Sequence, residues 1–179
     1  ISASAIGIYN DDSEIEMCED DELGNSWLSN LAQQWESSSH KFNKIGSRVV
    51  NLRISLLIDK DSGFLKKMLP LFKIGIVPLI GNKNNRFEYI DIDDAVNFCI
   101  KCLKNITIKG PYNLATNKKS TQIAFMKKIA NLYNKRFLII KIPEIIMKVI
   151  LGKRFKIINS NIKVSSKKII ETGFKFQEI

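Results

Sequence analysis

The first nine residues constrain the fold most strongly. Ile1 to Tyr9 read Ile-Ser-Ala-Ser-Ala-Ile-Gly-Ile-Tyr, carry no charge, and stop at the turn-forming Asn10. A short uncharged run bounded by turn formers is typical of a strand buried on both faces of a sheet. Such a strand needs a neighbour on each side. Because the chain begins with it, and with Ile in place of Met, we expect the sequence to start partway through a domain.

A helix and a second strand are predicted next. Trp27, Leu31 and Trp35 recur at i, i+4 and i+8, which places them on one face of a helix. Residues 50–56 then alternate between apolar and polar side chains, as a strand does. Strand, helix and strand at this spacing predict a βαβ unit with parallel strands. The carboxyl ends of such strands face the ligand crevice of an α/β sheet, so Ser4 is a candidate site residue.

The remaining pattern predicts an α/β fold. Strands are expected at 87–90, 112–114 and 137–142, and helices at 64–69, 91–103, 120–133, 144–151 and 167–171. Pro70 is expected to stop the first of these helices, because proline lacks the N–H that a helix interior uses. Residues 74–85 are rich in Gly, Pro and Asn and are expected to form an irregular loop.

The net charge of +10 suggests a nucleic-acid partner, but the kind of basic residue argues against it. Lysine supplies 23 of the 28 basic residues, and Lys, Asn and Ile share AT-rich codons. Base and phosphate recognition favours Arg. Residues 1–40 have a net charge of −9 and residues 41–179 one of +19. We therefore do not expect nucleic acid as the partner, and keep it as a third, weaker interpretation.

Composition also bears on the compartment. No stretch of about 18 uncharged apolar residues occurs, so no membrane span is expected. Three cysteines, an odd number, argue against a disulfide framework and favour a reducing, cytoplasmic location.

The cysteine pattern does not predict a metal site. A site that used Cys99-x-x-Cys102 would have only Cys18 and His40 as further His or Cys ligands, so no metal site is expected. Cys99 is expected in the core.

Several short segments, in order along nearly the whole chain, resemble the extended short-chain dehydrogenases/reductases. The resemblance is greatest to their branch of NAD(P)-dependent epimerase-like proteins with a short C-terminal domain. The matching segments are Ser2–Tyr9, Trp35-Glu36, Arg48–Arg53, Lys67–Phe72, Tyr89–Asp94, Gly110–Ala115, Ile142-Pro143 and Lys167–Phe176.

This resemblance implies the C-terminal part of a Rossmann-type parallel sheet plus a small α+β substrate-covering domain. The Rossmann-like part is expected at 1–58 and 87–115, and the smaller domain at 59–86 and 116–179. The complete protein is expected to bind NADP or NAD and a small-molecule substrate. The family's Gly-rich phosphate loop is not found in the 179 residues. The implied partner is therefore a missing N-terminal dinucleotide-binding segment, and no cofactor is expected to bind this fragment tightly.

The resemblance also implies site residues. Ser4 matches the serine that hydrogen-bonds the reacting oxygen of the substrate; the alternative is a small residue packed in a buried strand. Arg53 is expected either to meet an anionic group of the substrate or nucleotide, or to be exposed or ion-paired. Substrate or cofactor contacts are implied at these residues: Ala5, Ile6, Arg53, Ser55, Leu56, Met68 and Arg86. Arg86 stands where the family leads us to expect an aromatic residue.

Active members carry Tyr-x-x-x-Lys on the helix that corresponds to the first predicted helix of this chain. Here Trp27 and Leu31 stand at that spacing. The hydride chemistry that uses this Tyr/Lys pair is therefore not supported, and Trp27 and Trp35 are expected in the core. The leading interpretation is a fragment of an NAD(P)-dependent epimerase- or oxidoreductase-like protein, inactive alone. The alternative is a non-catalytic nucleotide-sensing or interaction protein that retains the fold.

Overall fold

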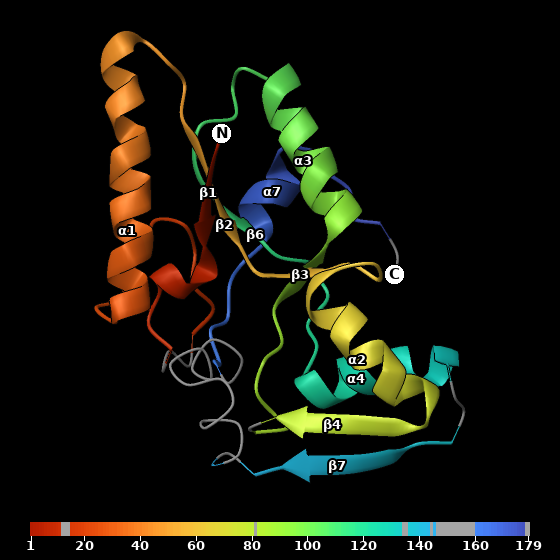
Figure 1. Cartoon of the computed structure of the whole chain (residues 1–179). Helices are drawn as coiled ribbons and strands as arrows, with labels where there is room; N and C mark the ends of the chain where they lie inside the picture. The colour runs from red at the N-terminus through yellow and green to blue at the C-terminus, as the bar shows by residue number, and fades with distance from the viewer. Residues whose placement is uncertain (12–14, 81, 134–135, 144, 146–159, 178–179) are drawn as a thin grey trace. The chain divides into compact units, whose positions relative to one another are not determined.

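The computed structural model describes the chain except for residues 12–14, 81, 134–135, 144, 146–159 and 178–179. The chain forms two compact units, which are described separately (Figure 1). The first unit comprises Ile1–Leu57, Glu88–Lys118 and Ile162–Ile179. The second comprises Ile58–Phe87 and Lys119–Asn161.

The first unit is built on a three-stranded parallel sheet. Strands β1 (Ser2–Ala5), β2 (Val50–Ile54) and β6 (Gly110–Leu114) lie side by side in that order. Ser4 pairs with Arg53, and Arg53 pairs with Asn113. The parallel pairing of β1 with β2 confirms the predicted βαβ unit. Within the described residues, however, β1 has a partner strand on one side only.

Helices cover both faces of this sheet (Figure 1). Helix α1 (Trp27–His40) packs against β1, and a 3-10 turn, η2 (Lys41–Ile45), follows it. Helix α3 (Ile92–Lys104) and the short α7 (Lys167–Glu171) cover the other face. The apolar side chains of β2 and β6 form the core with α3, α7 and the C-terminal aromatics: Val50, Leu52, Ile90, Ala95, Phe98, Cys102, Ile108, Tyr112, Leu114, Ile169 and Phe174.

Side-chain caps fix where two of these helices begin. The hydroxyl of Ser26 accepts a hydrogen bond from the Ser29 N–H at 3.1 Å, which starts α1. The carboxylate of Asp91 accepts one from the Asp93 N–H at 2.8 Å, which starts α3. Each cap satisfies an N–H that has no partner inside its own helix. Asp91 is the last residue of a short strand, β5 (Tyr89–Asp91), that pairs with β3 (Leu56–Ile58).

The buried face of α3 differs from the apolar pattern read from the sequence. In the sequence, Ala95, Val96, Cys99 and Leu103 form the expected apolar face of this helix, but Val96 and Leu103 are 48% and 69% exposed. Phe98 and Cys102 are fully buried in their place, and Cys99 is only partly buried. The helix carries two overlapping apolar stripes. The sheet and Phe174, whose ring meets that of Phe98 edge-on at 5.4 Å, select the stripe with the large aromatic.

The second unit contains the helices α2 (Gly63–Lys73) and α4 (Gln122–Tyr133) and the strands β4 (Ile76–Ile80) and β7 (Leu138–Ile142). The two strands are parallel, with Val77 opposite Ile139. Strand β4 falls in the segment expected to be an irregular loop, so that prediction is wrong. Among the described strands β4 pairs with β7 alone, and such a strand tolerates Pro78, because proline is excluded mainly from positions that must donate to a neighbour.

Helix α2 also runs past Pro70, where the sequence predicted it to stop. The fully buried Phe72 lies in the turn after the proline, and its burial stabilises that turn. The helix expected over 144–151 lies almost wholly outside the described residues.

The two compact units differ from the expected domain bounds mainly at the C-terminal segment. Residues 162–179, expected in the smaller domain, group with the first unit, where Phe174 and Phe176 pack against its core. Because both aromatics match the tail of the family that the chain resembles, they are expected to pack against the core, and the structure confirms this. The assignment of the two parts to cofactor and substrate stays a prediction.

Within the described part of the chain, none of the helices has both the length and the apolar character that crossing a membrane requires.

Candidate functional site

The carboxyl ends of β1, β2 and β6 lie at one edge of the sheet, because the three strands are parallel. Ala5 and Ile6 at the end of β1 are half-buried, as is Leu56 after β2. Ser55 is buried, and its hydroxyl donates to the Leu114 carbonyl at 2.9 Å. This edge is where an α/β sheet binds its ligand. The structure thus brings five of the predicted site residues (Ser4, Ala5, Ile6, Ser55 and Leu56) to or near one edge.

A buried ion pair lies beneath this edge, between the sheet and α1. Arg53 is 3% exposed, and its Nε donates to Glu36 Oε1 at 2.9 Å while Nη2 donates to Oε2 at 3.0 Å. Ser4, 4% exposed, donates its hydroxyl proton to the same Oε1 at 2.7 Å. Two parallel N–H bonds to one carboxylate are the strong, oriented form of this interaction. Arg53 is therefore ion-paired, which was one of the expected alternatives.

The network extends from Arg53 to the other strands. Its Nη1 donates to the Tyr9 hydroxyl at 2.7 Å and to the Glu19 carbonyl at 2.8 Å. Tyr9 in turn donates to Asn113 Oδ1 at 2.7 Å. The backbone N–H of Asn113 donates to Glu19 Oε1 at 2.8 Å. Through Tyr9, the network around Arg53 thus links segments more than a hundred residues apart in sequence.

Burial sets the proton affinities in this network. Desolvation raises the pKa of Tyr9 to about 12, although Arg53 opposes the shift. Desolvation also raises the pKa of Glu19, against the hydrogen bond from the Asn113 N–H. A tyrosine with so high a pKa keeps its proton at neutral pH. The Ser4 and Tyr9 hydroxyls both donate within the chain, so this arrangement orients the strand ends.

The remaining predicted site residues lie in the second unit. Met68 is half-buried on α2, and Arg86 forms an isolated bridge with Thr121. The backbone N–H of Arg86 donates to Asn161 Oδ1 at 2.8 Å. Contacts of these two residues with a substrate or cofactor stay predictions, as they do for the five residues at the strand ends and for Arg53.

Sequence reasoning missed Glu36, Tyr9, Asn113 and Glu19 as members of one network. A signal was present for the first of them. Glu36 is the only acidic residue between positions 23 and 58, and it lies on the helix that covers the sheet. Arg53 is the only arginine on the predicted strand. A single acid on a helix and a single arginine on the adjoining strand are candidates for a buried pair.

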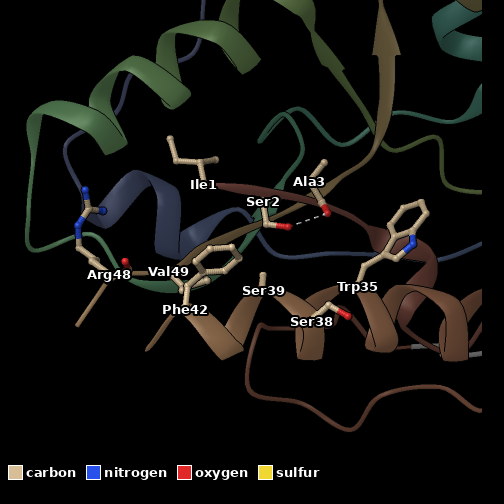
Figure 2. Close-up of a pocket in the computed structure, with 10 residues that line it drawn as sticks. Ile1, Ser2, Ala3, Trp35, Ser38, Ser39, Phe42, Arg48 and Val49 are labelled. Atoms are coloured by element: carbon tan, nitrogen blue, oxygen red, sulfur yellow. Dashed lines mark hydrogen bonds between the residues drawn. The ribbon is translucent and has the colours of Figure 1, made fainter. Parts of the chain in front are cut away.

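A pocket of about 640 Å³ lies at the other end of β1, between that strand and α1 (Figure 2). Ile1, Ala3, Trp35, Phe42 and Val49 supply its apolar walls, together with polar atoms of serines and Arg48. Trp35 is 49% exposed and Trp27 is 51% exposed, so the expectation that both belong to the core is wrong. The helix turns their shared face away from β2, and no described segment covers it.

The guanidinium of Arg48 is held at the rim of this pocket. Its Nη1 donates to the carbonyl of Ile108, and its Nη2 donates to that of Cys102 at 2.8 Å. Both acceptors belong to the end of α3 and the loop that follows. Arg48 therefore ties the start of β2 to α3 and is a structural residue of the pocket wall.

Several curated relatives match nearly the whole chain. The chain is 28% identical over 177 residues to an epimerase family protein of Arabidopsis thaliana, the chloroplastic SDR39U1 homolog, covering 99% of the chain and 50% of the relative. It is 28% identical over 179 residues to an epimerase family protein of Staphylococcus epidermidis, covering 98% and 59%. The chain thus spans about half the length of the relatives it matches. No protein-family model matches it.

Solved structures of epimerase-type proteins share the fold of this chain. The human epimerase family protein SDR39U1, solved with NADPH, superimposes with a TM-score of 0.88 at 21% identity, covering 98% of this chain and 59% of that one. A UDP-N-acetylglucosamine 4-epimerase from Bacillus cereus gives 0.78 at 18% identity, with the same coverage. The chain is therefore a homologue of the epimerase family proteins, with the α/β fold of the NAD(P)-dependent epimerases and short-chain dehydrogenases/reductases, and it corresponds to the C-terminal part of those larger proteins.

Proposed function

We propose that this chain is the C-terminal part of an NAD(P)-dependent, epimerase-like oxidoreductase. In this proposal it forms one wall of the crevice, with Ala5, Ile6, Ser55 and Leu56 near the reacting end of the dinucleotide and substrate. The observation that carries the proposal is the parallel β1-β2-β6 sheet, whose carboxyl ends meet at one edge above the buried Arg53–Glu36 pair. Homologues that match the chain over almost its full length support it.

The residues of this chain do not by themselves make a dinucleotide site. Binding the pyrophosphate takes a Gly-rich turn at a helix N-terminus, and no such turn occurs in the 179 residues. The cofactor, NADP or NAD, would supply the hydride chemistry when it is bound to the complete protein. The role of this chain is to orient the strand ends through its buried network and to form part of the substrate wall. We expect no turnover from the 179 residues alone.

A protein extended at its N-terminus tests this proposal. The N-terminal portion that the S. epidermidis relative has beyond the matched region would be joined to Ile1, and NADPH would be titrated against the product and followed by fluorescence. We expect saturable binding to the extended protein and none to the 179-residue chain. A folded extended protein that gives no response would contradict the proposal.

A second candidate function is a nucleotide-sensing or interaction protein that keeps the fold without the chemistry. Trp27 and Leu31 favour it, because they have the spacing of the Tyr/Lys pair of active enzymes and lack its titratable groups. Saturable NADPH binding without oxidation of the cofactor by any carbonyl substrate of a broad panel would favour the sensor. Oxidation of NADPH by one of these substrates would favour the enzyme.

A further inference from the structure

The charge of the chain divides unequally between the two compact units. The second unit holds 16 basic and three acidic residues in its sequence, a net charge of +13 over 73 residues. The first unit holds 12 basic and 15 acidic residues, a net charge of −3 over 106 residues. AT-rich codons can raise the lysine content of a whole chain, but they do not explain why one unit has so few acids. The second unit therefore carries a strong positive field of its own.

One end of the second unit exposes large apolar side chains. Ile74, Leu132 and Leu138 are 68%, 73% and 66% exposed. The Leu138 N–H donates to the Gly75 carbonyl at 2.7 Å, which places Leu138 close to Ile74. Leu132 lies in the last turn of α4, and Figure 1 shows the end of α4 and the starts of β4 and β7 at the same end of this unit. We call the exposed side chains at this end the apolar corner: Ile74, Leu132, Tyr133, Leu138 and Ile140.

Exposed lysines lie beside the apolar corner. Lys73 is the last residue of α2 and directly precedes the corner in sequence. Lys128 precedes Leu132 by four positions on α4, so the two side chains share one face of the helix. Lys141 is an exposed residue of β7. Positive charge therefore borders the apolar side chains on all three elements that form the corner.

An anionic lipid surface has the chemistry that this combination fits. A lysine beside inserted apolar side chains lays its methylene groups along the acyl boundary while its ammonium group stays among the headgroups. Tyrosine is enriched at the same depth, because its ring is apolar and its hydroxyl is polar. Anionic headgroups attract basic segments and hold them near the bilayer. Aliphatic residues alone would favour a protein partner, and lysines alone would favour any polyanion, but the apolar corner presents both.

We infer that the apolar corner docks the second unit on the surface of a bilayer that contains anionic phospholipid. The aliphatic side chains of the corner enter the boundary between headgroups and acyl chains, as the apolar face of an interfacial segment does. The lysines beside the corner contact the phosphates and carboxylates of the headgroups. This inference goes beyond the proposed function and does not depend on NADPH binding.

Other occupants fit the apolar corner less well. A second copy would bring together two surfaces of the same sign, because the sequence has no acid at 62–87 or 119–143. Single-stranded nucleic acid is bound by stacking its bases on aromatic rings, and Tyr133 supplies the one ring of the corner. An acidic protein would satisfy the lysines and is an outcome of the test.

Sedimentation with vesicles tests the inference on the 179-residue chain. Vesicles of phosphatidylcholine with about 30% phosphatidylserine would be compared with vesicles of phosphatidylcholine alone, both at about 0.1 M salt. We expect the protein to bind the anionic vesicles at least about tenfold more strongly. Binding that is equal on the two kinds of vesicle, or absent from the anionic vesicles, would overturn the inference.

A charge placed in the apolar corner tests whether its aliphatic side chains take part. Leu138→Glu is expected to weaken binding to the anionic vesicles at least about fivefold, because a carboxylate opposes both insertion and attraction. Leu103→Glu on α3, at a position 69% exposed, makes the same change of charge in the first unit and is the matched control. Equal losses of binding in the two variants would overturn the inference.

Thermal unfolding checks that the variants fold. If Leu138→Glu lowers the melting temperature, Ile74→Ser takes its place, with Leu103→Ser as its control. Ile74 follows the last residue of α2 and is 68% exposed, so its replacement removes apolar surface without opening the core. We expect Ile74→Ser to weaken vesicle binding at least about twofold. A folded Ile74→Ser variant that binds like the wild type would overturn the inference.

Two further measurements identify a different partner. Retention on immobilised DNA or polyglutamate that falls with Leu138→Glu, together with no binding to vesicles, would assign the corner to a nucleic acid or an acidic protein. Sedimentation velocity that shows a dimer for the wild type and a monomer for Leu138→Glu would assign the corner to a second copy. Either result would overturn the inference.

Discussion

At the scale of single residues, Arg53 organises the first unit. It is buried, forms two hydrogen bonds with the Glu36 carboxylate, and reaches Tyr9 and the Glu19 carbonyl with its remaining donors. A buried charge is tolerated only when it is paired and its hydrogen bonds are satisfied. Arg53 meets both conditions, so its removal leaves the Glu36 carboxylate buried without its counter-charge.

Arg53→Ala is therefore expected to lower the free energy of unfolding by about 3–5 kcal/mol. Lys167→Ala is the matched control, because the Lys167–Glu171 pair is also an acid–base contact but has side chains 80% and 62% exposed. That substitution should cost less than about 0.5 kcal/mol. Urea unfolding followed by circular dichroism measures both, and similar losses in the two variants would contradict the role given to Arg53.

Glu19 gives a pH-dependent prediction. Its pKa is raised in the fold because burial disfavours the charged form, so its proton stabilises the fold at low pH. This contribution is complete below the carboxyl pKa of the unfolded chain and is lost as pH rises through the folded pKa. Glu19→Gln keeps an acceptor for the Asn113 N–H without the charge. The variant is expected to gain stability over the wild type as pH rises from about 4 to 7.

Urea midpoints of the two proteins at pH 4, 5.5 and 7 measure this effect. Asp20→Asn, on the exposed neighbour of Glu19, is the control and should show no such trend. A difference between Glu19→Gln and the wild type that is constant across the three pH values would show that the buried carboxyl does not titrate as described.

At the scale of elements, caps and burial decide where the helices begin and which face packs. Asp91 caps α3, which carries Phe98 and Cys102 into the core. Asp91→Ala is expected to cost about 1 kcal/mol, because the N–H of Asp93 loses its acceptor. Asp91→Asn keeps an acceptor and should lower the free energy of unfolding by only about a few tenths of a kcal/mol. Thermal unfolding compares the two, and equal losses would show that the carboxylate charge matters more than the cap.

The elements also show where sequence patterns fail. The predicted strand at residues 50–56 and the helix start at Asp91 are found, because alternation and capping are local properties. Strand β4 was missed, since its pairing with β7 joins residues more than sixty positions apart. The inward stripe of α3 was misassigned for the same kind of reason. Two apolar stripes were available, and a distant aromatic, Phe174, determined which one packs.

At the scale of the whole molecule, the net charge of +10 is the feature most open to a different interpretation. The basic residues are mostly lysines, and Lys168 stacks over the Tyr112 ring at 4.8 Å instead of reaching outward. Phe174 and Phe176, which interleave with a lysine in sequence, pack in the core. The two aromatics are therefore not available to stack on bases of single-stranded nucleic acid.

Retention on immobilised DNA tests this interpretation. We expect any binding at low salt to be lost by about 0.15 M salt, because it would rest on a few non-specific phosphate contacts. A salt-resistant retention would instead support a nucleic-acid partner. A lysine-rich basic protein without nucleic-acid function, of similar net charge, is the comparison that separates specific retention from bulk charge.

The sequence by itself determined the α/β class and the parallel βαβ unit. Periodicity, caps and turn formers act over a few residues, so one chain is enough to read them. Only the tertiary structure decided that Arg53 is buried against Glu36, that Tyr9 and Asn113 share its network, and that Trp27 and Trp35 stay exposed. Burial depends on which distant segments meet. A lone acid on the helix and a lone arginine on the strand make the Arg53–Glu36 pair a candidate, but local patterns do not determine whether it forms or which other residues join it.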